Sequence, residues 1–179
     1  MVPVLEDKNE LRERIINLFL DEGFEVKKLP QPPQVNINWG LEVITPPPMR
    51  IKIHVISIPG KEDRIIVTLP VTISPQHLAE YNKLSPKEKI ELYSSMLQKL
   101  IHTCPTCQVV IQPGPLELRN IAVSKMIMVD ELDSKTAVEV FTLMINCFNI
   151  IISEINRVLP GPLLSQSGQG GEGGATTHF

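Results

Sequence analysis

The most apolar stretch of the chain lies between residues 134 and 158. Polar residues recur there at helical spacing and form one narrow stripe: Glu139, Thr142, Asn146, Asn149, Ser153 and Asn156. This spacing predicts a helix over 134–158 that other elements cover on most sides, with Asp133 or Ser134 as its N-cap. The asparagines argue against a membrane span, which needs about 20 mainly apolar residues. Two interpretations stay open: the helix belongs to the core alone, or it also faces a second copy of the chain.

Alternation of apolar and polar residues predicts a three-stranded antiparallel meander in the first half of the chain. The expected strands span residues 35–43, 50–58 and 64–73, with a hairpin-sized loop over 59–63. One side of these strands is assigned to the helix-covered face of the sheet: Val35, Ile37, Trp39, Ile53, Val67 and Leu69.

Three further helices follow from spacing and capping residues. Asp7 and Glu10 have capping-box spacing, and Gly23 is a suitable C-terminal residue for the first helix, whose apolar face carries Leu11, Ile15, Leu18 and Phe19. Ser74-Pro75 and Ser85-Pro86 each combine an N-cap with proline at the first helical position. They predict a short helix to about residue 82 and a longer one that carries on one side Ile90, Tyr93, Met96, Leu97, Leu100 and Ile101.

Two more strands, over 107–112 and 118–129, precede the last helix. The fold class is therefore α+β. We expect an antiparallel sheet, formed by a three-stranded meander plus a two-stranded return, with N- and C-terminal helices on one face in the order α-βββ-αα-ββ-α. We expect a single domain over residues 5–159 and a disordered Gly/Ser-rich tail over 160–179.

Composition narrows the class of protein. The net charge of −3 argues against direct nucleic-acid binding through bulk charge, and aromatic residues make up only 4% of the chain, so Ile, Val and Leu must build the core. The N-terminal residues lack the apolar segment of a signal peptide, so we expect a cytoplasmic protein. Abundant Ile and Pro favour a heat-adapted source.

Cys104 and Cys107 form the one reactive-looking motif. A redox pair needs its first cysteine at a helix N-terminus, whereas this pair follows a helix C-terminus. A zinc site needs about four ligands, and only His102 lies nearby. We expect a structural turn, with a local disulfide as one form of it, and keep a metal site or a catalytic thiol as alternatives. The sequence shows no catalytic residue, no cofactor motif and no small-molecule site.

The alternation also leaves apolar residues on the sheet face opposite the helices. These are Ile56, Ile58, Ile66, Met126 and Met128. Methionine adapts to varied partners, so we hypothesise that this face binds protein, either a second copy of the chain or a client segment. The alternative is that a loop or the helix pair covers it.

Several segments together resemble a known family. The first helix ends Asp21-Glu22-Gly23-Phe24 and leads into the meander, the paired Ser-Pro helices follow, and the chain closes with SKMIMVDELDSKTAVEVFTLMINCFNIIISEI. Over about residues 8–158 this resembles the type III secretion chaperone-like fold shared by YbjN-type proteins, and looks closest to a small, largely archaeal family. The resemblance implies a non-enzymatic protein-binding module, often dimeric. A CxxC-dependent metal or thiol protein and an accessory subunit of a nucleic-acid-processing complex stay open as alternatives.

Overall fold

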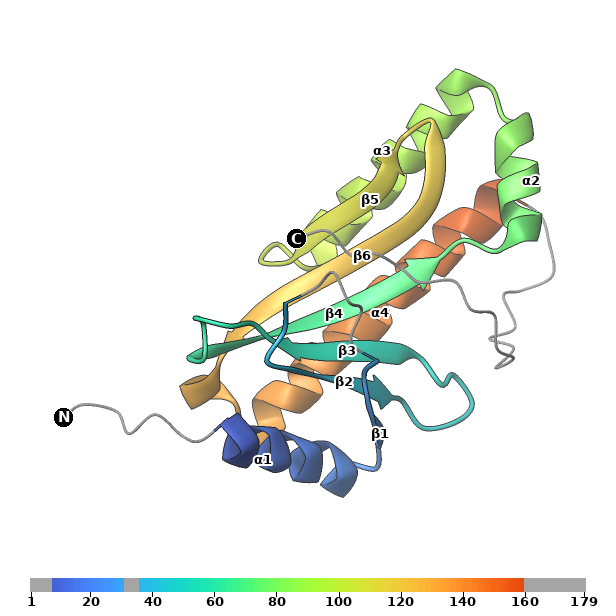
Figure 1. Ribbon diagram of the computed structural model, residues 1–179. Coiled ribbons are helices and arrows are strands. Elements are labelled where there is room, and N and C mark those ends of the chain that lie inside the picture. Colours follow the sequence, from blue (N-terminus) through green and yellow to red (C-terminus); the bar gives the residue numbers. More distant parts are fainter. Residues whose placement is uncertain (1–7, 31–35, 160–179) are drawn as a thin grey trace.

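The computed structural model describes residues 8–30 and 36–159. The chain forms a mixed α+β fold, in which helices lie against one side of a single sheet (Figure 1). The elements are α1 (Lys8–Asp21), β1 (Glu25–Lys28), β2 (Trp39–Ile44), β3 (Lys52–Ser57), β4 (Arg64–Thr72), α2 (Pro75–Lys83), α3 (Pro86–Thr103), β5 (Gln108–Gly114), β6 (Glu117–Met128), a 3-10 turn (Val129–Glu131) and α4 (Ser134–Val158). Asp7, Val35 and the expected tail over 160–179 lie outside the described residues.

The sheet has six antiparallel strands in the order β1-β2-β3-β4-β6-β5, so the predicted class is confirmed and the predicted strand number is one too few. The additional strand is β1, which is too short and too charged for alternation to reveal. It forms because α1 ends at Asp21 and Gly23, with a φ of +82°, turns the chain back so that β1 pairs with β2. β6 lies between β4 and β5 and pairs with both.

The first helix is held by aromatic contacts at its C-terminal end. Leu11, Ile15 and Phe19 are buried, as the spacing predicted. The Phe24 ring meets Phe19 edge-on at 5.9 Å, and Phe19 lies 4.5 Å from Phe141 of α4. These contacts fix α1 against the last helix.

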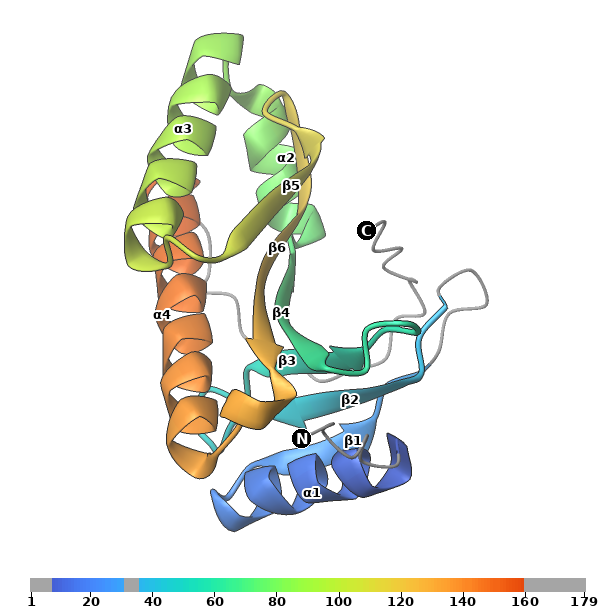
Figure 2. The ribbon, with the colours of Figure 1, turned by 90° about the vertical axis from the view of Figure 1, so that its left-hand side faces the viewer.

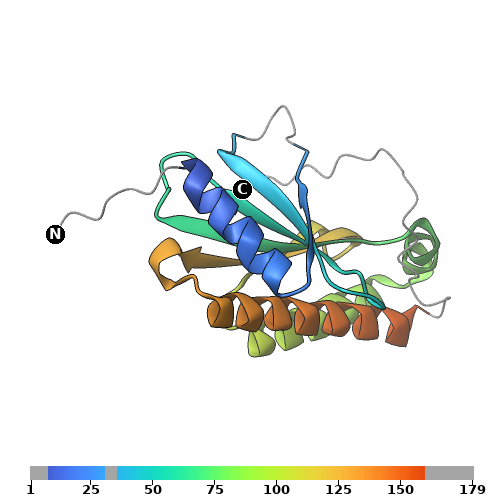
Figure 3. The ribbon, with the colours of Figure 1, turned by 90° about the horizontal axis from the view of Figure 1, so that it is seen from below.

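The last helix spans the predicted residues, and the Thr136 N–H donates to the Asp133 carboxylate at 2.7 Å. Its buried side comprises Ala137, Val140, Phe141, Met144, Cys147, Ile151, Glu154 and Ile155, and its polar stripe is exposed except for half-buried Asn156. α4 is the one described helix long and apolar enough to cross a membrane, a criterion that core helices of soluble proteins also meet. Its place against the sheet is that of a core helix (Figure 3).

Ser74 and Ser85 cap α2 and α3 as predicted. α3 runs beside α4 and buries Leu92, Met96 and Leu100 (Figures 2 and 3). The prediction that Ile90 and Ile101 share this packed side is wrong, because both side chains are about half exposed, at 49% and 50%. α3 lies at the margin of the helical layer, so the neighbouring elements bury a narrower strip of its surface than the spacing of its apolar residues predicted.

Candidate functional site

The strand register creates a second sheet face, which we call the open face, on the side away from α4. One row across β2, β3, β4 and β6 consists of Gly40, Ile56, Ile66 and Met126. α2 lies at the end of the sheet where β4 ends, and no other described helix lies over this face (Figures 1 and 2). The residues predicted as a protein-binding surface are therefore neighbours, although they come from three strands and a hairpin.

Three of these residues form the centre of the candidate site, which we call the apolar patch: Ile66, Met126 and Met128. Ile66 lies directly opposite Met126, and Met128 is opposite Arg64. The Met126 side chain is 48% exposed, whereas Ile66 and Met128 are half-buried. The Arg64 guanidinium places Nη1 3.6 Å from the Met126 sulfur and adds a polar rim. Ile58 is half-buried in the hairpin after β3.

Ile56 differs from the rest of the predicted surface because the chain's own residues cover its surroundings. It is only 7% exposed. A Cβ added at Gly40, its cross-strand neighbour, would meet Leu29 at 3.1 Å and Ile37 at 3.2 Å. Leu29 and Ile37 thus lie over this end of the open face. The predicted assignment of Ile37 to the helix-covered face is wrong for the same reason: β2 begins only at Trp39, so strand alternation does not reach Ile37.

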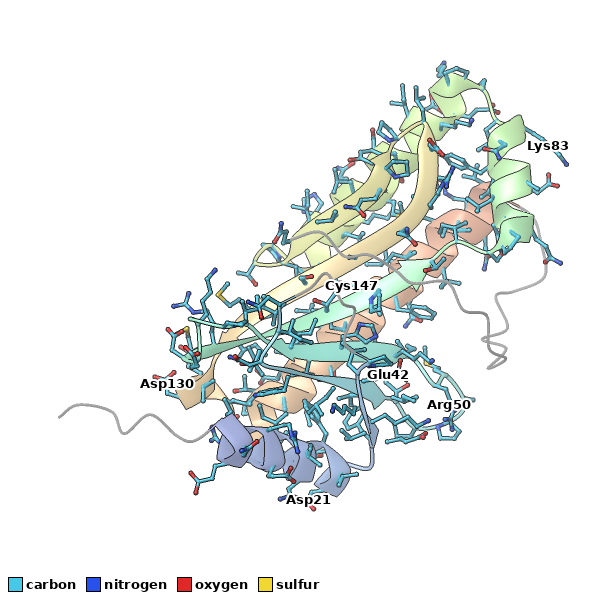
Figure 4. All side chains as sticks on the ribbon, in the orientation of Figure 1. Asp21, Glu42, Arg50, Lys83, Asp130 and Cys147 are labelled. Carbon is cyan, nitrogen blue, oxygen red and sulfur yellow. A yellow bond between two sulfur atoms is a disulfide. The ribbon has the colours of Figure 1, made fainter. Side chains whose placement is uncertain are left out.

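A polar row runs next to the apolar row on the open face. Glu42, His54, Thr68 and Ser124 are in register across β2, β3, β4 and β6. The Glu42 carboxylate lies 3.8 Å from His54 Nε2 and 3.5 Å from Lys52 Nζ, and the Thr68 and Ser124 hydroxyls share a hydrogen bond of 2.9 Å. Figure 4 shows Glu42 on its strand. The sequence analysis did not predict this row, because the order of the strands in the sheet decides which polar residues become neighbours.

The polar row pairs its own groups and gives no arrangement suited to nucleophilic catalysis. Burial lowers the pKa of His54 although the Glu42 carboxylate opposes this, so the imidazole is neutral at pH 7. The His54 side chain is 24% exposed. Thr68 and Ser124 are bonded to each other rather than to a base. The row is therefore a stripe of polar side chains that pair with one another, next to the apolar patch.

Cys104 and Cys107 are joined by a disulfide directly after α3. Cys104 is the C-cap of that helix, and the Cys107 N–H donates to the Cys104 carbonyl at 3.0 Å, which closes a turn. Cys147 is buried separately in α4. Within the described residues, no group of three or more His, Cys, Asp or Glu side chains is placed to hold a metal ion.

Comparisons with known proteins agree with this architecture. A profile described as "Uncharacterized conserved protein (DUF2299)" matches residues 11–155. The crystal structure of an uncharacterized protein from Methanothermobacter thermautotrophicus has a TM-score of 0.73 at 19% identity, covering 83% of this chain and 99% of that one. YbjN from E. coli, described as a candidate transcription regulator, has a TM-score of 0.51 at 10% identity, covering 87% and 97%. No curated protein matches. The predicted resemblance is confirmed, and at these identities it establishes the fold alone.

Proposed function

The chain belongs to the family described as Uncharacterized conserved protein (DUF2299), and we propose that it is a non-enzymatic adaptor-type module that binds another protein through the open face. The observation that carries this proposal is the apolar patch. Ile66, Met126 and Met128 come together from β4 and β6 on the open face, away from the end where α2 lies, and Met126 is half exposed.

The patch has the chemistry of a protein-binding surface. Fully burying a large apolar side chain contributes roughly 1.5–3 kcal/mol of favourable free energy. A partner that covers the exposed part of the apolar patch therefore gains binding energy. Methionine is unbranched and fits differently shaped partners. Arg64, at the margin, is paired with Asp63 at 2.6 Å and provides a polar rim of the kind found around protein interfaces.

Charge pairing on and around this face favours protein over nucleic acid as the partner. Lys27 is paired with Glu25 at 2.7 Å, Lys52 with Glu42 at 3.5 Å, and Arg64 with Asp63. Phosphate binding relies on cations available to neutralise the backbone, whereas these three are partly neutralised already. The net charge of −3 points the same way.

The disulfide and the fold are consistent with a cytoplasmic protein from a heat-adapted organism. Cytoplasmic disulfides are rare in mesophiles and common in hyperthermophiles, and a chain of the same fold comes from Methanothermobacter thermautotrophicus. In this proposal the Cys104–Cys107 bond closes the turn after α3 and takes no part in binding.

The test is a pair of charge insertions into the patch. We expect Ile66→Glu plus Met128→Glu to abolish partner recovery in quantitative affinity purification from native cells, while circular dichroism shows a folded chain. Leu116→Glu is the matched control, because Leu116 is an exposed apolar residue of the β5–β6 hairpin outside the patch. Equal recovery by the double variant and the control would rule out the open face as the binding surface.

A further inference from the structure

The described methionines differ widely in their exposure to solvent. Met96 and Met144 are fully buried, with 0% exposure, whereas Met126 is 48% exposed and Met49 is 39% exposed. Met128 is half-buried and lies on the same sheet face as Met126, two residues further along β6. An oxidant must reach the sulfur of a methionine in order to modify it. Met126 and Met49 are therefore the most accessible of these sulfurs, and only Met126 belongs to the apolar patch.

The guanidinium of Arg64 is fixed beside the sulfur of Met126. Arg64 Nε donates to one carboxylate oxygen of Asp63 at 2.8 Å, and Nη2 donates to the other at 2.6 Å. This two-bond pairing fixes the plane of the guanidinium, and Nη1 lies 3.6 Å from the Met126 sulfur. A thioether sulfur is only a weak acceptor, so the present contact uses little of the hydrogen-bonding capacity of Nη1.

A sulfoxide oxygen suits this position better than the thioether does. When a peroxide oxidises methionine, the S–O bond forms as the O–O bond breaks, the sulfur loses two electrons, and the peroxide leaves as water or an alcohol. The new oxygen is a polar acceptor on the atom that Nη1 already contacts. Its hydrogen bond with the guanidinium is charge-assisted and therefore stronger than a neutral one. The Asp63–Arg64 pair is thus arranged to hold the oxidised form of Met126.

We propose that Met126 is an oxidation-sensitive modification site that controls binding at the open face. A peroxide converts its thioether to the sulfoxide, the Arg64 guanidinium holds the new oxygen, and the centre of the apolar patch becomes polar. A partner must then bury the sulfoxide and the guanidinium bonded to it, which costs desolvation free energy, so binding weakens. This inference rests on the proposed function, because it names the regulation of the same surface.

The first experiment measures partner binding before and after oxidation. The purified chain is treated with hydrogen peroxide until peptide mapping by mass spectrometry finds the Met126 sulfoxide in nearly every molecule, and it is then used for quantitative affinity purification from native cells. For each chain, recovery after treatment is divided by recovery before it, so differences in basal binding cancel. We expect this ratio to fall at least about tenfold for the wild type and for Met49→Leu. At the same dose it should stay near one for Met126→Leu, which has no sulfur at this position.

The second experiment needs no partner. Urea unfolding is measured for the wild type and for Arg64→Leu, each with and without the Met126 sulfoxide. We expect oxidation to lower the unfolding midpoint less in the wild type than in Arg64→Leu, because only the wild type has a guanidinium that can hold the new oxygen. Comparing the two losses cancels the effect of the Arg64 substitution itself, including the loss of its pair with Asp63.

The two experiments separate this proposal from the proposed function. Equal losses of midpoint in the two chains, or a wild-type ratio near one, overturn the oxidation switch while partner binding by the untreated chain still supports the proposed function. A fall of the same size in all three ratios also overturns the switch, because it places the sensitive group outside Met126. If the untreated wild type recovers no partner, the proposed function is refuted, and the urea comparison then decides on its own whether Arg64 holds the sulfoxide.

Discussion

Glu154 allows the sharpest stability prediction, because it is a charged side chain at the α3–α4 contact that is only 1% exposed. The Ser95 hydroxyl donates to it at 2.7 Å, Arg157 Nη2 donates at 3.0 Å, and Lys99 donates to its other oxygen. Burial raises the pKa of this carboxyl, but the hydrogen bonds from Lys99, Arg157 and Ser95 outweigh that effect and lower the pKa from 4.5 to about 2.

This lowering corresponds to about 3 kcal/mol of stability from the ionised form, at about 1.4 kcal/mol per pKa unit. Lys99 and Arg157 are 53% and 55% exposed, so solvent screening reduces the contribution, and we expect about 2 kcal/mol. Because the folded-state pKa is depressed, this stability is fully present above pH 4.5 and is lost as the pH falls toward 2.

The variant Glu154→Gln keeps the size of the side chain and removes its charge. We expect urea unfolding to show it about 2 kcal/mol less stable than wild type at pH 7, with the difference shrinking steadily below pH 4.5. Glu139→Gln, on the exposed side of the same helix, is the control and should stay within about 0.5 kcal/mol. A difference that is the same at pH 7 and pH 3 would refute the electrostatic explanation.

Two further predictions test the cover over Ile56 and the role of the disulfide. Gly40→Val should lower stability by about 1–3 kcal/mol in thermal unfolding, because its side chain would clash with Leu29 and Ile37. Gly114→Ala is the control and should be nearly neutral, because a Cβ there meets nothing within 4 Å. Equal effects of the two changes would show that Leu29 and Ile37 move aside at little cost. Replacing Cys104 and Cys107 with serine should cost about 2 kcal/mol in urea unfolding but leave partner recovery unchanged. Lost recovery in that folded variant would give the cysteines a binding role.

Local patterns predicted most of the fold because they follow from single elements. Helical spacing predicted the bounds of α4, and two Ser-Pro pairs predicted the starts of α2 and α3. The same logic missed β1, where four residues with three charges give no alternation. It also misplaced Ile90 and Ile101, because the width of a buried helix face depends on which neighbours lie beside it.

The candidate site was predictable only in part, for the same physical reason. Alternation assigned Ile66, Met126 and Met128 to one face, but only the pairing of β4 with β6 makes them neighbours. The polar row from Glu42 to Ser124 depends entirely on strand order. The burial of Ile56 depends on where Leu29 and Ile37 lie, and both residues are outside the strands in which alternation predicts the face.

The most direct measurement of partner binding is methionine oxidation footprinting at Met126. Met49 is an internal reference, since it is exposed at 39%, close to the 48% of Met126, and lies in the loop between β2 and β3 away from the apolar patch. The oxidation rate of each is compared between the purified chain and the chain in native cell lysate. If another polypeptide covers the open face, Met126 oxidises several-fold more slowly in the lysate while the rate of Met49 relative to free methionine is unchanged. Equal protection of the two residues, or none at Met126, would contradict the proposed function.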